Sequence, residues 1–166
     1  MRPDIFWIGP APTGLLAIMP HPRGGARLAS ALQALVGVGV RSVVSLLTDA
    51  EADELDLAHE AATCAALGLR FRHLPIADMG TPASDMEAAA VASALHDDLA
   101  SGLAVAIHCR AGVGRSSTLA ACVLALAGVP PDAAFARIAA ARGCPVPETA
   151  GQRAWVEAFA RGLPRP

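Results

Sequence analysis

Residues 108–117 read HCRAGVGRSS and lie between two apolar runs of the chain. The run before them, residues 103–107, is short and uninterrupted, which is typical of a buried strand. The run that follows, residues 116–129, is apolar on all sides and shorter than the roughly 20 residues that cross a membrane, which indicates a buried helix. The sequence therefore predicts a strand, a glycine-containing loop and a helix in direct succession.

The rest of the chain alternates between strand and helix patterns in the same way. Thr48 and Ser84 are each followed by a glutamate three residues on, the pattern of a capping box that begins a helix. Strands are expected at residues 5–8, 15–19, 43–47, 70–76 and 103–107, and helices at residues 26–38, 49–67, 84–101, 116–129, 132–141 and 149–161. This alternation predicts an α/β fold with a central parallel-dominated sheet flanked by helices, in one domain spanning residues 1–166.

The net charge and the residue composition limit the classes of binding partner that we expect. The formal net charge is −2, and the chain contains no lysine. A nearly neutral chain has no general attraction to nucleic acid or to acidic membranes, so neither is expected as a partner. The oligomeric state stays open.

The cysteines and histidines give no metal pattern. Cys64, Cys109, Cys122 and Cys144 are widely spaced, without the paired cysteines of a zinc ribbon or a thioredoxin-like site. The remaining histidines outside the loop do not cluster either, and no metal or organic cofactor is implied. The N-terminus lacks the apolar run of a signal peptide, so we expect reduced thiols and a cytoplasmic location.

The loop between the predicted strand and helix has the features of an anion site. Gly112 and Gly114 allow the backbone to curl so that its N–H groups converge at the start of a helix. Arg115 adds a planar pair of charged donors that suits phosphate. The expected substrate-binding residues are Arg110, Ala111, Gly112, Val113, Gly114 and Arg115.

Cys109 lies at the beginning of this loop, where the same donors would stabilise a thiolate. We expect this thiolate to act as a nucleophile. Ser116 is placed to donate a hydrogen bond to the sulfur, and His108 is expected to lie beneath the loop, to fix it and to stabilise the thiolate. A structural cysteine beside an ordinary glycine turn is the alternative, but it leaves the arginine and serine without a role.

The pattern H-C-x-x-G-x-x-R-S at residues 108–116 resembles the signature of the protein tyrosine phosphatase superfamily, and the small size resembles its dual-specificity branch, including bacterial members. This resemblance implies a protein tyrosine phosphatase-like fold and hydrolysis of phosphomonoesters through a phosphocysteine intermediate. The implied substrates are phosphorylated proteins, with phosphotyrosine first and phosphoserine or phosphothreonine as additions, or small phosphomonoesters. The loop has none of the lysines that relatives acting on inositol lipids often carry.

Asp78 is the expected general acid. It follows the predicted strand at residues 70–76, and residues 75–82, PIADMGTP, resemble the acid loop of this family. Capping of a turn is the alternative role. Other carboxylates have structural interpretations: those at residues 49, 51 and 85 begin helices, and those at residues 97 and 98 lie on a solvated helix face.

Several alternatives stay open. A rhodanese-like sulfurtransferase also holds a cysteine in an anion-binding loop, a pseudophosphatase would bind phosphate without turnover, and arsenate reduction would need a partner thiol. Arg110 is expected to face the cleft and favour acidic flanks of a substrate. Gln152 completes a capping box with Thr149, and an accessory role at the site is secondary. Protection of Cys109 by a disulfide to another cysteine is undecided.

Overall fold

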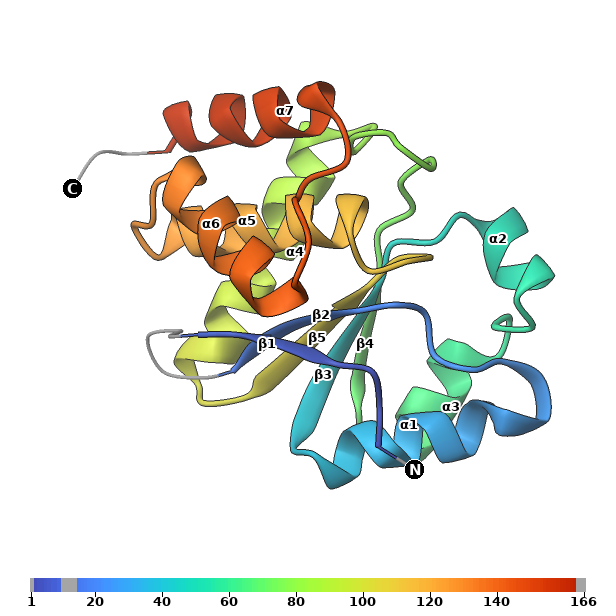
Figure 1. The fold of residues 1–166 in the computed structure, drawn as a ribbon. Coiled ribbons are helices and arrows are strands. Elements are labelled where there is room, and N and C mark those ends of the chain that lie inside the picture. Colours follow the sequence, from blue (N-terminus) through green and yellow to red (C-terminus); the bar gives the residue numbers. More distant parts are fainter. Residues whose placement is uncertain (1, 10–14, 164–166) are drawn as a thin grey trace.

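The computed structural model describes residues 2–9 and 15–163, and its centre is a 5-stranded sheet with the strand order β1-β2-β5-β3-β4 (Figure 1). Strand β1 runs antiparallel to β2, and the pairs β2–β5, β5–β3 and β3–β4 are parallel. The parallel-dominated sheet is therefore confirmed. The strands are β1 (Phe6–Ile8), β2 (Leu16–Met19), β3 (Val40–Ser45), β4 (Arg70–His73) and β5 (Ala104–His108).

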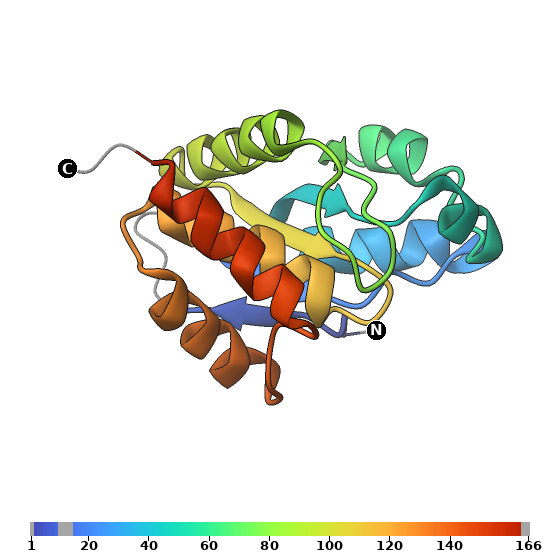
Figure 2. The ribbon, with the colours of Figure 1, turned by 90° about the horizontal axis from the view of Figure 1, so that it is seen from above.

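Helices cover both faces of the sheet (Figures 1 and 2). A short 3₁₀ turn (Gly25–Arg27) leads into α1 (Leu28–Gly37), which packs with α3 (Glu60–Ala66) on one face. The other face carries α4 (Asp85–Ala100), α5 (Gly114–Leu126), α6 (Pro131–Arg142) and α7 (Ala150–Arg161). Each face has its own cluster of buried apolar side chains, so the sheet lies between two hydrophobic layers.

The helix that follows the signature stretch is the centre of the larger layer. Residues 114–125 of α5 are all buried, and α4, α6 and α7 each pack against this helix. The apolar run at residues 116–129 predicted this burial. Among the described residues, no helix is both long enough and apolar enough to cross a membrane.

The expected single helix over residues 49–67 is wrong. The chain forms α2 (Asp49–Glu54), then a turn in which Asp56 takes a φ of 55°, and only afterwards α3. The turn packs against the loop after β2, where the N–H of Gly25 donates to the carbonyl of Asp56 at 2.8 Å. The contact with a segment distant in the sequence thus outweighs the local helical pattern, and α2 ends at Glu54.

The expected solvated position of Asp98 is also wrong. Asp98 is 2% exposed and pairs with Arg70 and Arg72 of β4, whereas Asp97 next to it is exposed. Burial acts to raise the pKa of Asp98, but hydrogen bonds from Arg72, Ser42 and Arg70 outweigh it, and the pKa lies below its usual range. This carboxylate therefore links α4 to the edge of the sheet.

The pairing of Asp98 with the two arginines of β4 predicts that substitutions at Asp98 and at the adjacent Asp97 change stability by different amounts. Asp98→Asn should lower the free energy of unfolding by about 2 kcal/mol, because two charged hydrogen bonds are weakened. Asp97→Asn is the matched control and should change it by less than about 0.5 kcal/mol. Urea unfolding of both variants measures the difference, and equal stabilities would contradict the assigned role of Asp98.

Candidate active site

Residues 109–114, here named the Cys109 loop, comprise the connection from β5 to α5 and the first residue of α5, and they lie at the carboxyl end of the central strand. Neighbouring segments hold it closely: the N–H of His21 donates to the carbonyl of Arg110 at 3.3 Å. Gly112 has a φ of 67°, and a Cβ atom there would lie 2.4 Å from the carbonyl carbon of Met19. Glycine is required at this position by both conformation and space.

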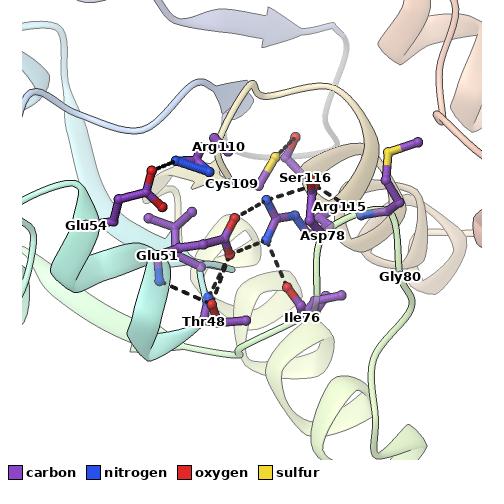
Figure 3. Close-up of polar contacts among 12 residues, drawn as sticks. Thr48, Glu51, Glu54, Ile76, Asp78, Gly80, Cys109, Arg110, Arg115 and Ser116 are labelled. Atoms are coloured by element: carbon purple, nitrogen blue, oxygen red, sulfur yellow. Dashed lines mark hydrogen bonds and ion pairs between the residues drawn. The ribbon is translucent and has the colours of Figure 1, made fainter.

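Arg115, in the first turn of α5, is 1% exposed and has a fixed guanidinium (Figure 3). Its Nη1 donates to Glu51 Oε2 at 2.7 Å and to the carbonyl of Ile76 at 2.9 Å, and its Nη2 donates to Glu51 Oε1 at 2.9 Å. Two parallel bonds to one carboxylate fix the plane of the guanidinium as well as its position.

Glu51 makes this contact from the capping box of α2. The box is formed as expected: the backbone N–H and the hydroxyl of Thr48 both donate to Glu51 Oε2. The pair with Arg115 was not foreseen, because it joins residues 64 positions apart and the capping pattern already explained the glutamate. The hydrogen bond from Arg115 lowers the pKa of Glu51 to about 2, against the opposing effect of burial.

The structure brings Cys109 and Ser116 together. Cys109 is 3% exposed, and its Sγ lies 3.6 Å from Ser116 Oγ, within hydrogen-bonding range of sulfur. His108 is fully buried at the end of β5, and its Nε2 lies 2.9 Å from Glu60 Oε1 of α3. Sequence analysis did not identify Glu60, which follows a turn and carries no motif. Within the described residues no hydrogen bond joins the ring of His108 to the sulfur, so its expected effect on the thiolate stays a prediction.

Asp78 lies in the segment after β4, residues 77–83, here named the Asp78 loop. Its Oδ1 is 3.2 Å from Arg115 Nη2 and accepts a hydrogen bond from the N–H of Met79 at 3.1 Å. The side chain is 62% exposed, so it stands at the open side of the site rather than in the core. Figure 3 shows Asp78 and Glu51 both directed at the Arg115 guanidinium.

Gln152 connects the Asp78 loop with the beginning of α7. The capping box with Thr149 is confirmed, and the side-chain oxygen also accepts from the N–H of Glu148. Its Nε2 donates to the carbonyl of Gly80 at 3.1 Å, and the residue is completely buried. A Cβ on Gly114 would lie 3.0 Å from the Gln152 amide, so this side chain lies close to both loops.

Other predicted residues take more peripheral positions. The side chain of Arg110 extends from the Cys109 loop toward α2, where its Nη2 donates to Glu54 Oε1 at 2.6 Å on the surface. Cys64 and Cys122 are buried free thiols, and burial raises the pKa of Cys64 to about 12 and also raises the pKa of Cys122. Both thiols are therefore poorly suited to thiolate chemistry. Cys144 is half-buried and free.

One family model and several solved structures are similar to this chain. A family model described as "polymorphic toxin system, DSP-PTPase phosphatase" matches residues 17–129. No curated protein matches the chain. Among solved structures, kinase-associated phosphatase carrying a serine in place of its catalytic cysteine is 21% identical, with a TM-score of 0.86 over 97% of this chain and 96% of that one.

Two further solved structures share the fold. The active form of Tk-PTP is 24% identical, with a TM-score of 0.75 over 98% of this chain and 100% of that one. PTPMT1 in complex with PI(5)P is 20% identical, with a TM-score of 0.74 over 88% of this chain and 90% of that one. The α/β architecture is thus that of protein tyrosine phosphatase-like proteins.

The lowered pKa of Glu51 predicts how stability depends on pH. The folded state holds the ionised carboxylate more tightly than the unfolded state, so this stabilisation is present above pH 4.5 and is lost as the pH falls toward about 2. Glu51→Gln should lower the free energy of unfolding by about 2–3 kcal/mol at pH 7, and the difference from wild type should shrink below pH 4.5.

Chemical unfolding between pH 2 and pH 7 tests this expectation. Glu54→Gln, on the exposed side of the same helix, is the control and should follow the wild-type curve. A pH-independent difference between Glu51→Gln and wild type would show that the ion pair with Arg115 does not carry the effect.

Proposed function

The chain belongs to the DSP-PTPase phosphatase family of polymorphic toxin systems, and on this premise we propose that it hydrolyses phosphomonoesters through a phosphocysteine formed on Cys109. The chain is an enzyme of the protein tyrosine and dual-specificity phosphatase type. We propose that residues 1–166 form one such catalytic domain. The observation that carries the mechanism is the meeting of Cys109, a fixed Arg115 and Asp78 at one end of the sheet.

In the first step, the Cys109 thiolate attacks phosphorus, the S–P bond forms and the bond from phosphorus to the leaving oxygen breaks. Asp78 gives its proton to that oxygen, a role supported by its position 3.2 Å from the guanidinium at the open side of the site. In the second step, water attacks phosphorus and Asp78 takes a proton from it. The S–P bond breaks, and the hydroxyl of Ser116 stabilises the departing thiolate.

Arg115 and the backbone of the Cys109 loop bind the phosphoryl oxygens. The contacts with Glu51 and Ile76 use both protons of Nη1 and one proton of Nη2, and they hold the guanidinium without reorganisation during the reaction. Preorganised donors of this kind stabilise the charge that spreads over the phosphoryl oxygens in the transition state. Asp78 must move from Arg115 Nη2 or share that atom when the phosphoryl group binds.

Substitutions at the three residues test the mechanism with p-nitrophenyl phosphate and a chelator present. Cys109→Ser and Arg115→Ala should abolish turnover, and Asp78→Asn should lower kcat by about 10²–10⁴-fold. The loss in Asp78→Asn should be larger for phenyl phosphate, whose leaving group needs the proton more. Glu87→Gln, an exposed carboxylate at the start of α4, is the control.

Turnover that survives Cys109→Ser would refute the phosphocysteine. Transfer of sulfur from thiosulfate to cyanide would favour the rhodanese-like alternative. Phosphate binding by a wild-type protein that turns over no aryl phosphate would favour the pseudophosphatase. The thiolate needs a reduced cysteine, so we propose the cytoplasm as the place of action.

We propose phosphotyrosine in proteins as the main substrate class, with phosphoserine and phosphothreonine as additional substrates. Asp78 is exposed and Arg110 lies at the surface in its pair with Glu54, which supports an open rim that a peptide can approach. The charge of Arg110 is already balanced there, so a preference for acidic flanks would require this pair to break.

A comparison of substrates tests this choice. kcat/KM for phosphotyrosyl peptides should exceed that for the matching phosphoseryl peptides and for PI(5)P, the lipid bound by the similar PTPMT1. A higher kcat/KM for the lipid in detergent micelles would replace the protein-phosphatase assignment with a lipid phosphatase. The Cys109→Ser variant controls for contaminating activity.

A further inference from the structure

Arg142, in the last turn of α6, reaches the outer side of the Cys109 loop. Its Nε donates to the carbonyl of Gly112 at 2.9 Å, and its Nη2 donates to the carbonyl of Ala111 at 3.3 Å. These bonds join segments 30 residues apart. No motif in the sequence connects this arginine with the loop.

The two carbonyls fix the direction of two amide groups. In a planar trans peptide, the C=O and N–H groups point in opposite directions. The carbonyls of Ala111 and Gly112 point at Arg142, so the N–H groups of Gly112 and Val113 in the same peptide units point away from α6. The orientation of these two N–H donors therefore depends on the hydrogen bonds that Arg142 makes to the carbonyls of the same peptide units.

The backbone around Gly112 needs contacts from outside the loop to fix its conformation, because glycine allows a wide range of backbone angles. Gly112 has a φ of 67°, in the region that only glycine enters without strain. Either peptide unit next to it could rotate at low cost and turn a carbonyl oxygen toward a bound phosphate. Hydrogen bonds to both carbonyls oppose this rotation.

The guanidinium of Arg142 also packs against an aromatic ring. Its central carbon lies 4.3 Å from the centre of the Phe6 ring in β1, a cation–π geometry. In the part of the chain that the structure describes, no carboxylate pairs with Arg142. Its charge therefore stays available to the loop, unlike that of Arg110, which Glu54 balances.

We propose that Arg142 is a positioning residue that, supported by Phe6, orients the N–H groups of Gly112 and Val113 toward the phosphoryl oxygens. The proposal rests on the phosphate-binding role of the Cys109 loop. It assigns no contact between Arg142 and the substrate. Its effect is on phosphate affinity, which can be measured without turnover.

The test is binding of inorganic phosphate, followed by calorimetry and by the amide signals of Gly112 and Val113 in NMR spectra. In wild type, both amide protons should shift downfield on saturation. Arg142→Gln should weaken binding about tenfold, the loss expected for one charge-assisted hydrogen bond, and should remove these shifts. Arg142→Lys keeps the charge but lacks the fork and should recover only part of the affinity.

Two further variants separate orientation from folding. Arg161→Gln, at the exposed end of α7, should bind phosphate as wild type does. Phe6→Leu should weaken binding about threefold in wild type, the loss of one exposed cation–π contact, and should have no effect in the Arg142→Gln background. This non-additivity is expected because Phe6 acts through Arg142.

Unchanged phosphate affinity in folded Arg142→Gln would overturn the proposal. Full recovery in Arg142→Lys would also overturn it, since charge alone would then explain the effect. If Arg142→Gln does not fold, the Lys and Phe6 variants still decide the matter through the two amide signals. Absence of turnover in wild type would refute the proposed function and leave the binding result interpretable.

Discussion

The buried pair between Glu51 and Arg115 is the interaction on which the site depends. An arginine that is 1% exposed needs a partner, and the capping carboxylate of α2 supplies one with two parallel bonds. Glu51 lies in the first turn of α2, and the turn that follows α2 packs on the loop after β2. The capping carboxylate of α2 thus fixes a cation close to the end of β5.

The remaining contacts position the loops around that cation. Gln152 joins the Asp78 loop to α7 through the carbonyl of Gly80, and Arg142 joins the Cys109 loop to α6. Both contacts come from helices of the larger apolar layer, which pack on the fully buried α5. A rigid layer therefore holds a glycine-rich loop whose own backbone preferences would leave it mobile.

Sequence reasoning succeeded where the information is local. The strand, loop and helix around residues 108–117, the parallel-dominated sheet and the capping boxes at Thr48 and Thr149 all follow from neighbouring residues. It failed where a distant contact decides. The helix over residues 49–67 is broken by packing against another loop, and Asp98 is buried by two arginines of β4. The partners of Arg115 and of the Cys109 loop were missed for the same reason.

The most direct test of the central claim is to trap the covalent intermediate on Cys109. Wild type and Ser116→Ala are mixed with a phosphorylated aryl substrate, quenched in acid within milliseconds and digested for mass spectrometry. The account predicts a peptide containing Cys109 that is heavier by one phosphoryl group and accumulates more in Ser116→Ala, because loss of the hydroxyl slows the second step. A phosphoryl group found on another residue, or turnover with no modified Cys109 peptide in either protein, would contradict it.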